Sequence, residues 1–420
     1  MVQAVRGMRD ILPLEGQRWR MLEDQLNEVL LSYGYEPIAL PLLEFTDLFA
    51  RGVGEATDIV EKEMYSLADR DGDSLSLRPE GTAGCVRALL EHGLLFNQTQ
   101  RVFYAGPMFR YEKPQKGRYR QFYQIGAEAF GMPGPDIDAE LIKMCADFWT
   151  VLGITDHVRL EVNSLGDKQA RQRYREALVN YLTPFAADLD EDSARRLQTN
   201  PLRILDSKVT KTQQIVADAP TLESFVDDNS RAHFDQLRDM LTKLGVPWQH
   251  NPKLVRGLDY YTHTVFEWIT DSLGAQGTVC AGGRYDGLVE QLEGRPTPAV
   301  GFALGLDRVT LLHEVCHQDV APKAVEAYVC VATQDDNVDG YVYAQQIAHL
   351  LRQGGLRTRV HAGSGNFKKQ LKRADAVNAS WAVLLGQEEL SNQQVTVKYL
   401  ATGEQNTLSI DEVLQFLTNN

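Results

Sequence analysis

The fold is decided by residues 109–131, FRYEKPQKGRYRQFYQIGAEAFG. The two ends of this stretch have the composition of strands, and the middle is a loop with Gly117 and several basic side chains, which predicts an antiparallel hairpin. Side chains alternate between the faces of a strand, so Gln124 and Glu128 point to the same side. On the other arm, the guanidinium of Arg110 can bind a phosphate through two parallel hydrogen bonds. The hairpin is therefore a candidate nucleotide platform, although a hairpin that faces solvent has the same pattern.

The segments around this hairpin predict a largely antiparallel sheet with helices packed on it. Apolar residues at helical spacing indicate a helix over residues 16–33, and an extended segment with two prolines follows over 35–43. Further strand-like runs are joined by turns and short loops rather than by helical crossovers, which favours antiparallel pairing. The expected strands are 74–77, 101–105, 121–130, 158–162, 264–269, 277–281 and 299–304, and a helix is expected at 141–152.

The remaining segments differ from this pattern in composition and in the order of predicted elements. From Lys168 to about Pro247, charged helical stretches such as QARQRYREALVNYL dominate and strand signals are few, which indicates a helical insertion. Residues 314–323 are polar and are expected to form a linker. From Ala324 onward, strands and helices alternate, as in a small α/β domain.

Composition bounds the class of protein. The 420 residues carry a net charge of −14, which alone argues weakly against nucleic acid as a partner, because phosphate contacts need clustered Lys and Arg. Two local basic stretches exist, at 110–121 and 367–373, and either one could instead be a solvated surface. The five cysteines form no C-x-x-C pair, so we expect buried thiols in a reducing cytoplasm rather than a zinc site or disulfides. Neither a membrane span nor a signal peptide is expected.

Three further motifs combine glycines with charged or aromatic residues. SLRPEGTAG, at 76–84, is a turn that leads into a helix, where Glu80 could hold an ammonium group or simply cap the helix. The pair LVRGLDYYTHTVFE (254–267) and AGGRYDGL (281–288) offers Arg and Tyr side chains beside glycines that allow a ligand to come close, although two strands with buried tyrosines would look similar. VGFALGLDRV (300–309) is a glycine-rich strand that runs into a helix bearing Arg308, a weak phosphate-binding pattern.

Together these motifs resemble one family. FRYE with its basic loop resembles motif 2 of the class II aminoacyl-tRNA synthetases, GFALGLDR resembles motif 3, and the segment that ends at Pro41 resembles motif 1. LVRGLDYYTHTVFE and AGGRYDGL resemble the two signature segments of the histidine-specific branch, and RPEGTAG also fits. Order and spacing match over essentially the whole chain. One departure is Thr262-His263, after the tyrosines, where the pattern has Asn-Arg or similar.

The resemblance implies a fold and a reaction. The fold is an α+β catalytic domain with the antiparallel sheet of class II synthetases, a helical insertion and a C-terminal α/β anticodon-binding domain. The implied boundaries are 1–167 and 251–318 for the catalytic domain, 168–250 for the insertion and 324–420 for the anticodon-binding domain. The reaction is the activation of L-histidine with ATP and Mg²⁺, followed by transfer to tRNA(His). Motif 1 implies a homodimer, and the family implies a cytoplasmic enzyme.

The resemblance also assigns roles in histidine binding. Glu80, Thr82 and Gln124 would hold the α-amino group of histidine. Glu128 and Tyr261 would bond the two imidazole nitrogens. The residues that would line the rest of the pocket are Gly282, Gly283 and Tyr285.

Catalysis and RNA binding are assigned to other residues. Arg110 and Arg308 would bind the ATP phosphates, with Glu112 near the adenine. Arg256 would lie between the histidine carboxylate and the α-phosphate, so the implied catalytic residues are Arg256, Arg110 and Arg308. No metal site built from protein side chains is implied. The residues expected to approach the acceptor end of tRNA are Gln115 and Arg120.

Other members of the same fold are the main alternatives. A regulatory paralogue that partners ATP phosphoribosyltransferase shares the catalytic fold but lacks the tail and the basic motif 2 loop. Class II synthetases for proline, threonine or glycine would not be expected to have the pair Glu128 and Tyr261 in the histidine pattern. A ligase on the same fold that does not use tRNA would not need the tail.

Overall fold

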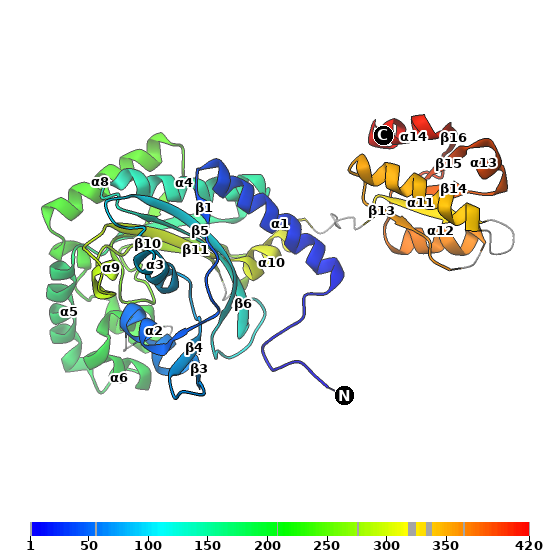
Figure 1. Cartoon of the computed structure of the whole chain (residues 1–420). Helices are drawn as coiled ribbons and strands as arrows, with labels where there is room; N and C mark the ends of the chain where they lie inside the picture. Colours follow the sequence, from blue (N-terminus) through cyan, green and yellow to red (C-terminus); the bar gives the residue numbers. More distant parts are fainter. Residues whose placement is uncertain are drawn as a thin grey trace. The chain divides into compact units, whose positions relative to one another are not determined.

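The structure is a computed structural model that describes residues 2–54, 57–207, 209–274, 277–317, 325–332, 338–363 and 366–419. The chain divides into two compact units, one made of residues 1–11 and 19–318 and the other of 12–18 and 319–420. Figure 1 follows the chain through both units. Each unit has its own core and is described by itself.

An eight-stranded sheet forms the centre of the first unit. Its strand order is β1-β5-β6-β11-β10-β9-β7-β8. Neighbouring strands from β5 through to β7 are all antiparallel, and only the outermost pairs, β1 with β5 and β7 with β8, are parallel. In sheet order the strands are Glu36–Pro37, Gln100–Phe109, Gln121–Phe130, Ala299–Gly305, Thr278–Arg284, Thr262–Ile269, Arg159–Ser164 and Trp248–His250. The predicted antiparallel sheet is therefore confirmed.

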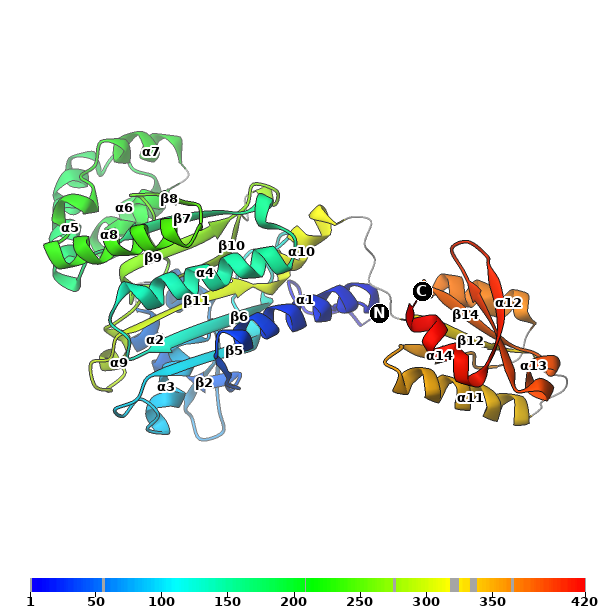
Figure 2. The same cartoon turned by 90° about the horizontal axis from the view of Figure 1, so that it is seen from above.

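Helices cover both faces of this sheet, because alternate strand residues are apolar on both sides (Figure 2). Phe103 and Ile125 point into one core with four helices, and Val102 and Tyr104 point into the other. The helices of the first core are α1 (Pro13–Ser32), α4 (Pro135–Val151), α8 (Asp228–Lys243) and α10 (Leu306–Cys316). The second core includes α3 (Thr82–Glu91), α5 (Lys168–Leu182) and α9 (Leu288–Gln291).

A small sheet with the strand order β2-β4-β3 is formed by residues that precede α3 in the sequence. Its strands are Leu43–Phe45, Ser74–Leu77 and Tyr65–Ala68. The short helices near it are α2 (Thr46–Val53), which packs on α3, and a π-helical turn, η1 (Ile59–Glu63). A 3₁₀ turn, η2 (Thr155–His157), precedes β7.

A run of helices interrupts the main sheet between β7 and β8. These two strands are neighbours in the sheet, so residues 168–243 leave it and return to it; we call them the helical segment. Asp167, Asp190 and Asp227 accept hydrogen bonds from backbone N–H groups at the starts of α5, α6 and α8, which satisfies donors that a helix leaves open. The remaining elements are η3 (Thr183–Phe185), α6 (Glu191–Thr199), η4 (Pro201–Asp206), α7 (Thr210–Ala217) and η5 (Leu222–Phe225).

The second unit is a five-stranded mixed sheet with helices. The strand order is β13-β12-β14-β15-β16, with parallel pairing around β12 and antiparallel pairing from β14 to β16. Separate apolar clusters cover its two faces. Its elements are β12 (Ala327–Val331), α11 (Val338–Gln353), β13 (Thr358–Val360), α12 (Phe367–Ala376), β14 (Trp381–Leu385), α13 (Gln387–Asn392), β15 (Gln394–Tyr399), β16 (Gln405–Ser409) and α14 (Ile410–Asn419).

Several sequence expectations change at their edges. The first helix and α4 begin earlier than expected, because Pro13 and Pro135 stand in their first turns, where a missing N–H is tolerated. Helix α10 continues to Cys316, into the expected linker, and residues 318–323 of that linker lie outside the described residues. Only Glu36–Pro37 of the expected extended segment pairs in the main sheet. The cysteines are free thiols, all buried except the partly exposed Cys316.

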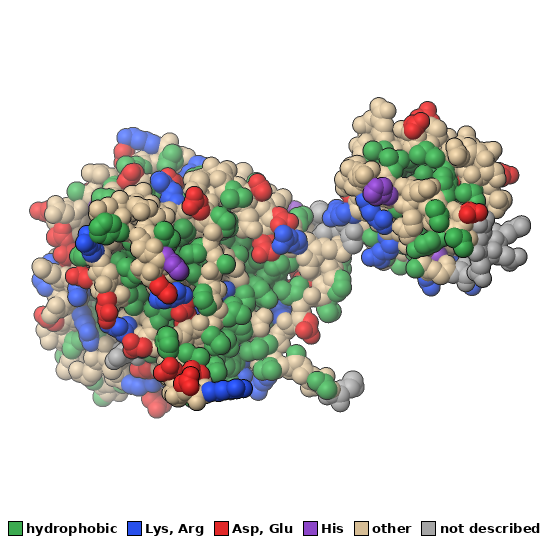
Figure 3. Space-filling model, in the orientation of Figure 1, with side chains coloured by type: hydrophobic (Ala, Val, Ile, Leu, Met, Phe, Trp, Pro, Cys, Tyr) green, Lys and Arg blue, Asp and Glu red, His purple; other side chains and the backbone are tan. Residues whose placement is uncertain are grey.

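Surface charge is mixed in sign. On the face of the first unit that Figure 3 shows, acidic and basic side chains are interspersed rather than gathered in one patch. Among the described residues, no helix is both long and apolar enough to span a membrane.

Candidate active site

One pocket in the first unit is lined by residues from the hairpin motif and from all three of the further glycine-containing motifs. Its walls come from β6, β10 and β11, the start of α3 and the loop before β9. They enclose a cavity of about 180 Å³ that opens to solvent. The predicted site residues that line it are Glu80, Thr82, Arg110, Glu112, Gln124, Glu128, Arg256, Tyr261, Tyr285 and Arg308.

A buried carboxylate stands at one side of this pocket. Oε1 of Glu128 accepts hydrogen bonds from the Thr82 hydroxyl at 2.8 Å and from the Tyr104 hydroxyl at 3.0 Å. Its Oε2 accepts a bond from the Tyr285 hydroxyl. Burial raises the pKa of Glu128 to about 8, although the three hydroxyl bonds act in the opposite direction. The carboxylate is therefore held at a fixed place and is poised to bind a polar N–H group.

Glycines make room for these groups. Gly301 of β11 lies opposite Glu128 of β6, and a Cβ at Gly301 would collide with the carboxylate. Gly126 lies opposite Tyr104, and a Cβ there would collide with the tyrosine ring. Larger residues at either glycine would displace the carboxylate or its hydroxyl partner, so the backbone itself forms part of the pocket wall.

Glu80 has two relations to the pocket. Its carboxylate accepts the backbone N–H of Thr82 at 2.7 Å and that of Ala83 at 2.9 Å, so it caps the start of α3. Burial raises the pKa of Glu80, and these backbone bonds oppose the shift. The capping interpretation is therefore confirmed, and Glu80 lines the pocket as well.

Guanidinium groups form another part of the pocket wall. Arg110 donates through Nε to the Pro79 carbonyl at 2.9 Å, which fixes its orientation. Arg308 donates to the carbonyls of Gly117 at 3.1 Å and Thr278 at 2.7 Å. Backbone carbonyls thus help to orient both side chains.

The electrostatics of this wall favour an anion. Burial lowers the pKa of Arg308 to about 10, and repulsion from Arg110 and Arg118 acts in the same direction. Burial likewise lowers the pKa of Arg110, with a further contribution from Arg256. A bound anion would offset the repulsion between these positive charges. This part of the pocket is therefore suited to phosphates or a carboxylate.

Two buried polar atoms in the pocket have no hydrogen-bond partner among the described residues. One is the amide Oε1 of Gln124, and the other is Nε of Arg256. Arg256 also pairs with Glu267, whose charge raises the pKa of Arg256 against the lowering effect of burial. Its guanidinium carbon lies 5.8 Å from the centre of the Tyr261 ring. Unpaired buried polar atoms are costly. We therefore expect a ligand donor at Oε1 of Gln124 and a ligand acceptor at Nε of Arg256.

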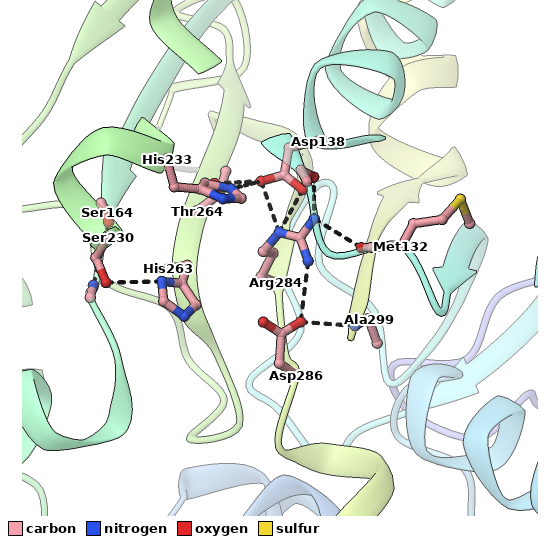
Figure 4. A network of polar contacts seen from close by, with 12 residues as sticks. Met132, Asp138, Ser164, Ser230, His233, His263, Thr264, Arg284, Asp286 and Ala299 are labelled. Carbon is pink, nitrogen blue, oxygen red and sulfur yellow. Dashed lines mark hydrogen bonds and ion pairs between the residues drawn. The ribbon is translucent and has the colours of Figure 1, made fainter. Parts of the chain in front are cut away.

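Gly282 and Gly283 are not among the lining residues. A Cβ at Gly283 would lie 3.0 Å from the Tyr261 ring, so this glycine lets strand β10 pack behind that tyrosine. Arg284 does not line the pocket either, and Figure 4 shows it among Asp138, Met132 and Asp286. It is fully buried and pairs with Asp138 at 2.8 Å, which gives it a structural role instead of the expected contact with a ligand.

The basic loop of the β5–β6 hairpin is partly ordered by its own side chains. Gln115 is exposed, and its backbone pairs with that of Arg118. The Arg118 side chain forms an ion pair with Glu112. Arg120 donates to the Glu112 carbonyl at 3.1 Å, and its guanidinium carbon lies 3.6 Å from the centre of the Tyr111 ring. Neither Gln115 nor Arg120 lines the pocket, as expected of residues meant for a macromolecule.

Sequence reasoning missed three contributors to the pocket. Tyr104 bonds Glu128, but only the strand register, which sets it opposite Gly126, reveals it. Arg118 lies in the basic loop, where composition did not distinguish it from its neighbours. Asp307 accepts the Tyr123 backbone N–H at 2.8 Å, and its position beside Arg308 in GFALGLDR was the available signal.

The described residues contain no cluster of three or more His, Cys, Asp or Glu side chains arranged to hold a metal ion. Neither Thr262 nor His263, the departure from the family pattern, lines the pocket. His263 is bonded instead to Ser230 of α8, at 3.2 Å, and its backbone has a left-handed φ of 47° (Figure 4).

Comparisons with known proteins agree on one family. The family model described as histidyl-tRNA synthetase matches residues 7–309, and the model described as anticodon binding domain matches residues 327–420. The crystal structure of the apo histidyl-tRNA synthetase of S. aureus is similar over 99% of this chain and 100% of that one, at 35% identity and a TM-score of 0.79.

Two more distant structures share the fold. The histidyl-tRNA synthetase of Nostoc sp. PCC 7120 has 18% identity and a TM-score of 0.74, with 99% of both chains covered. A protein from Bacillus halodurans C, described as an ATP phosphoribosyltransferase regulatory subunit/histidyl-tRNA synthetase, has 23% identity and a TM-score of 0.66, with 92% of this chain and 98% of that chain covered.

Proposed function

The chain belongs to the histidyl-tRNA synthetase family, which joins histidine to tRNA at the expense of ATP, and from this premise we propose that the pocket lined by β6, β10 and β11 carries out both steps. The observation that carries the proposal is the combination of charges in one pocket. Buried Glu128 with its hydroxyl partners and the guanidinium groups of Arg110, Arg256 and Arg308 all line it. A zwitterionic amino acid with a polar ring and a polyphosphate together match such a pocket.

Histidine binds with its ring toward the buried carboxylate. Glu128 accepts one imidazole N–H and the Tyr261 hydroxyl meets the other nitrogen, so both ring nitrogens are satisfied. Gln124 offers its unpartnered Oε1 to the α-ammonium group, with Glu80 and Thr82 beside it. Tyr285 holds Glu128 in place rather than binding the amino acid directly.

Activation needs positioning and positive charge rather than a covalent intermediate. The carboxylate oxygen of histidine attacks the α-phosphorus of ATP, the bond to the β-phosphate oxygen breaks, and pyrophosphate leaves. Arg256 bridges the attacking carboxylate and the α-phosphate, where its Nε has no other partner. Arg110 and Arg308 bind the remaining phosphates, and Glu112 lies near the adenine. Charge that develops in the transition state is thereby met by groups already oriented by their neighbours.

Transfer uses the same pocket from its open side. The hydroxyl of the terminal ribose of tRNA attacks the carbonyl carbon of the adenylate, and AMP leaves with the electron pair of the broken bond. Gln115 and Arg120, in the hairpin loop outside the pocket, contact the acceptor end. The second unit binds the anticodon, which agrees with the domain model that matches residues 327–420.

The finer features of the protein follow from the same proposal. The catalytic domain comprises 1–167 and 251–318, the insertion 168–250 and the anticodon-binding domain 324–420. ATP enters as its Mg²⁺ complex, because the metal ion shares the negative charge on the pyrophosphate side. The enzyme is a cytoplasmic homodimer, a proposal supported by its free thiols and by exposed apolar residues on and beside the small sheet, Leu42, Leu43, Phe45 and Leu67.

A single-turnover experiment tests the proposed use of this pocket. The protein, histidine and ATP labelled at the α-phosphate should give an enzyme-bound labelled adenylate, and added tRNA(His) should release the label as AMP. In Arg308→Met the adenylate should form more slowly at a given ATP concentration, because a phosphate contact is lost. Adenylate formation at the wild-type rate and ATP affinity in that variant would refute the phosphate role of this wall.

A further inference from the structure

The loop that carries Arg256 and Tyr261 has no place in the sheet. Residues 254–261 form no helix or strand, and β9 begins only at Thr262. A loop that must hold two substrate-binding side chains within a fraction of an ångström needs support from elsewhere, since it lacks the hydrogen-bond ladder of a strand.

Support comes from α5 in the helical segment. Nη1 of Arg171 donates to the backbone carbonyl of Asp259 at 3.0 Å and also to that of Tyr261. These two carbonyls flank Tyr260, so one guanidinium holds the backbone on both sides of that residue. Arg171 is partly buried, and hydrogen bonds from a charged donor are stronger than those between neutral groups.

The 3₁₀ turn η4 supplies a second contact. Nη2 of Arg203 donates to the carbonyl of Gly257 at 2.9 Å, next to Arg256. A Cβ at Gly257 would lie 2.6 Å from that same nitrogen, so a larger residue there would require the Arg203 guanidinium to move. Asn200 adds a bond to the Asp259 side chain at 3.1 Å.

The two regions also share one apolar core. Tyr174 and Leu178 of α5 belong to the same buried cluster as Tyr260, Tyr261 and Tyr285. Beyond the loop, Ser230 of α8 bonds His263, the second residue of β9, at 3.2 Å (Figure 4). The helical segment thus contacts the chain at 257, 259, 261 and 263.

We infer that the helical segment positions the histidine-binding loop, and that Arg171 and Arg203 are positioning residues for histidine activation. The inference rests on the proposed roles of Arg256 and Tyr261. Neither arginine lines the substrate pocket, so each acts only through the backbone it holds. The histidine site is therefore completed from outside the sheet.

Arg175 provides a matched control on the same helix. Its Nη2 also donates to two backbone carbonyls, those of Gln198 at 3.2 Å and Thr199 at 2.8 Å, but both lie within the helical segment. Arg175→Met therefore removes the same kind of contact without touching the loop. Any effect shared by Arg175→Met and Arg171→Met reflects the stability of the segment rather than the position of the loop.

The test compares Arg171→Met, Arg203→Met and Arg175→Met in histidine-dependent ATP–pyrophosphate exchange, with melting temperatures as a check of folding. The loss of a charged hydrogen bond should raise the KM for histidine by about tenfold or more in Arg171→Met and Arg203→Met. The KM for ATP should change less, and Arg171→Lys should recover part of the loss. Arg175→Met should stay within about twofold of the wild type.

Histidine KM values near the wild type in both folded loop-side variants, or equal effects in all three variants, would overturn the inference. If Arg171→Met fails to fold, Arg203→Met and Arg171→Lys decide by the same criteria. Tyr261→Phe separates this inference from the proposed site. An unchanged histidine KM in Tyr261→Phe removes the assigned role of the loop, whereas a raised KM there with normal arginine variants removes only the positioning role.

Discussion

The burial of Glu128 lowers the stability of the folded protein but serves the proposed binding of histidine. The carboxylate is buried among hydroxyls in a site that has no cation directly bonded to it in the described contacts, and its pKa is raised to about 8 by that burial. Such a group weakens the folded state when it ionises. We interpret this cost as the consequence of keeping an acceptor ready for an imidazole N–H.

Glu128→Gln should damage histidine activation far more than its small change of shape suggests. A carboxamide can present its N–H₂ group where the substrate needs an acceptor. Sites built to bind a substrate N–H can discriminate by factors of about 10⁴. The measurement is the kcat/KM for histidine in pyrophosphate exchange, and values within twofold of the wild type would mean that Glu128 does not bind the ring.

The same substitution should stabilise the protein in alkaline solution. The pKa of Glu128 is about 8 in the folded chain against an ordinary value of 4.5, so the unfolded chain loses this proton first as the pH rises. The contribution of Glu128 to wild-type stability is therefore constant below about pH 4.5, falls between about 4.5 and 8, and is constant above.

A neutral glutamine lacks this dependence. The melting temperature of Glu128→Gln relative to the wild type should therefore rise from pH 5 to pH 8, with a free-energy difference of roughly a few kcal/mol at the upper end. The check is thermal unfolding of both proteins, without ligands, across this range. A difference that is constant with pH would show that Glu128 has an ordinary pKa.

Arg256→Ala should slow adenylate formation more than it weakens substrate binding. Removal of one oriented charge at the transition state costs about 3 kcal/mol, or more than a hundredfold in rate. The wild type and the variant should be compared for kcat and for both KM values. Loss of histidine or ATP affinity at an undiminished rate would make Arg256 a binding residue only, and a melting curve controls for the Glu267 carboxylate left unpaired.

At the scale of elements, the strands and the loop of the hairpin β5–β6 have different proposed roles. The strands place Gln124 and Glu128 in the pocket, whereas the loop residues Gln115 and Arg120 lie outside it. Gln115→Ala and Arg120→Ala should therefore spare adenylation and slow transfer to tRNA, because an arginine offers two donors to a phosphate or a guanine. Arg120 also packs on Tyr111, so its variant needs a folding check. Equal losses in pyrophosphate exchange and in tRNA charging would mean that the loop is structural.

Elements with strong patterns were predictable, and those set by distant contacts were not. Strands β4 and β6 have the expected bounds. Strand β16, QNTLS, was missed because it is polar and exposed, and only pairing with β15 makes it a strand. In the pocket, Tyr104 and the carbonyl contacts of Arg171 depend on register and on packing between distant segments, which a single sequence does not encode locally.

At the scale of the whole molecule, the two units have separate cores. No residue of the apolar clusters in the second unit belongs to those around the main sheet, within the part of the chain described. The exposed basic residues of α12 lie on one side of that helix, opposite the buried Gln370 and Ala374: Lys368, Lys369, Lys372 and Arg373. A local surface of this kind can meet an RNA backbone although the net charge of the protein is negative.

Deletion of the chain after Gln318 should separate the two activities. All pocket residues precede that position, so pyrophosphate exchange should persist, while the apparent KM for tRNA should rise and lose part of its dependence on salt. The truncated protein and the full chain should be compared in both assays, with sedimentation to follow the proposed dimer. Undiminished charging of full-length tRNA by the truncated protein would contradict the role given to the second unit.

The most direct test of the central claim is ATP–pyrophosphate exchange measured with each of the twenty amino acids in turn. The account predicts exchange that depends on histidine, is negligible with the other nineteen, and falls sharply in Glu128→Gln. Exchange that is absent with histidine, or that is supported better by another amino acid, would contradict the assignment of this pocket to histidine.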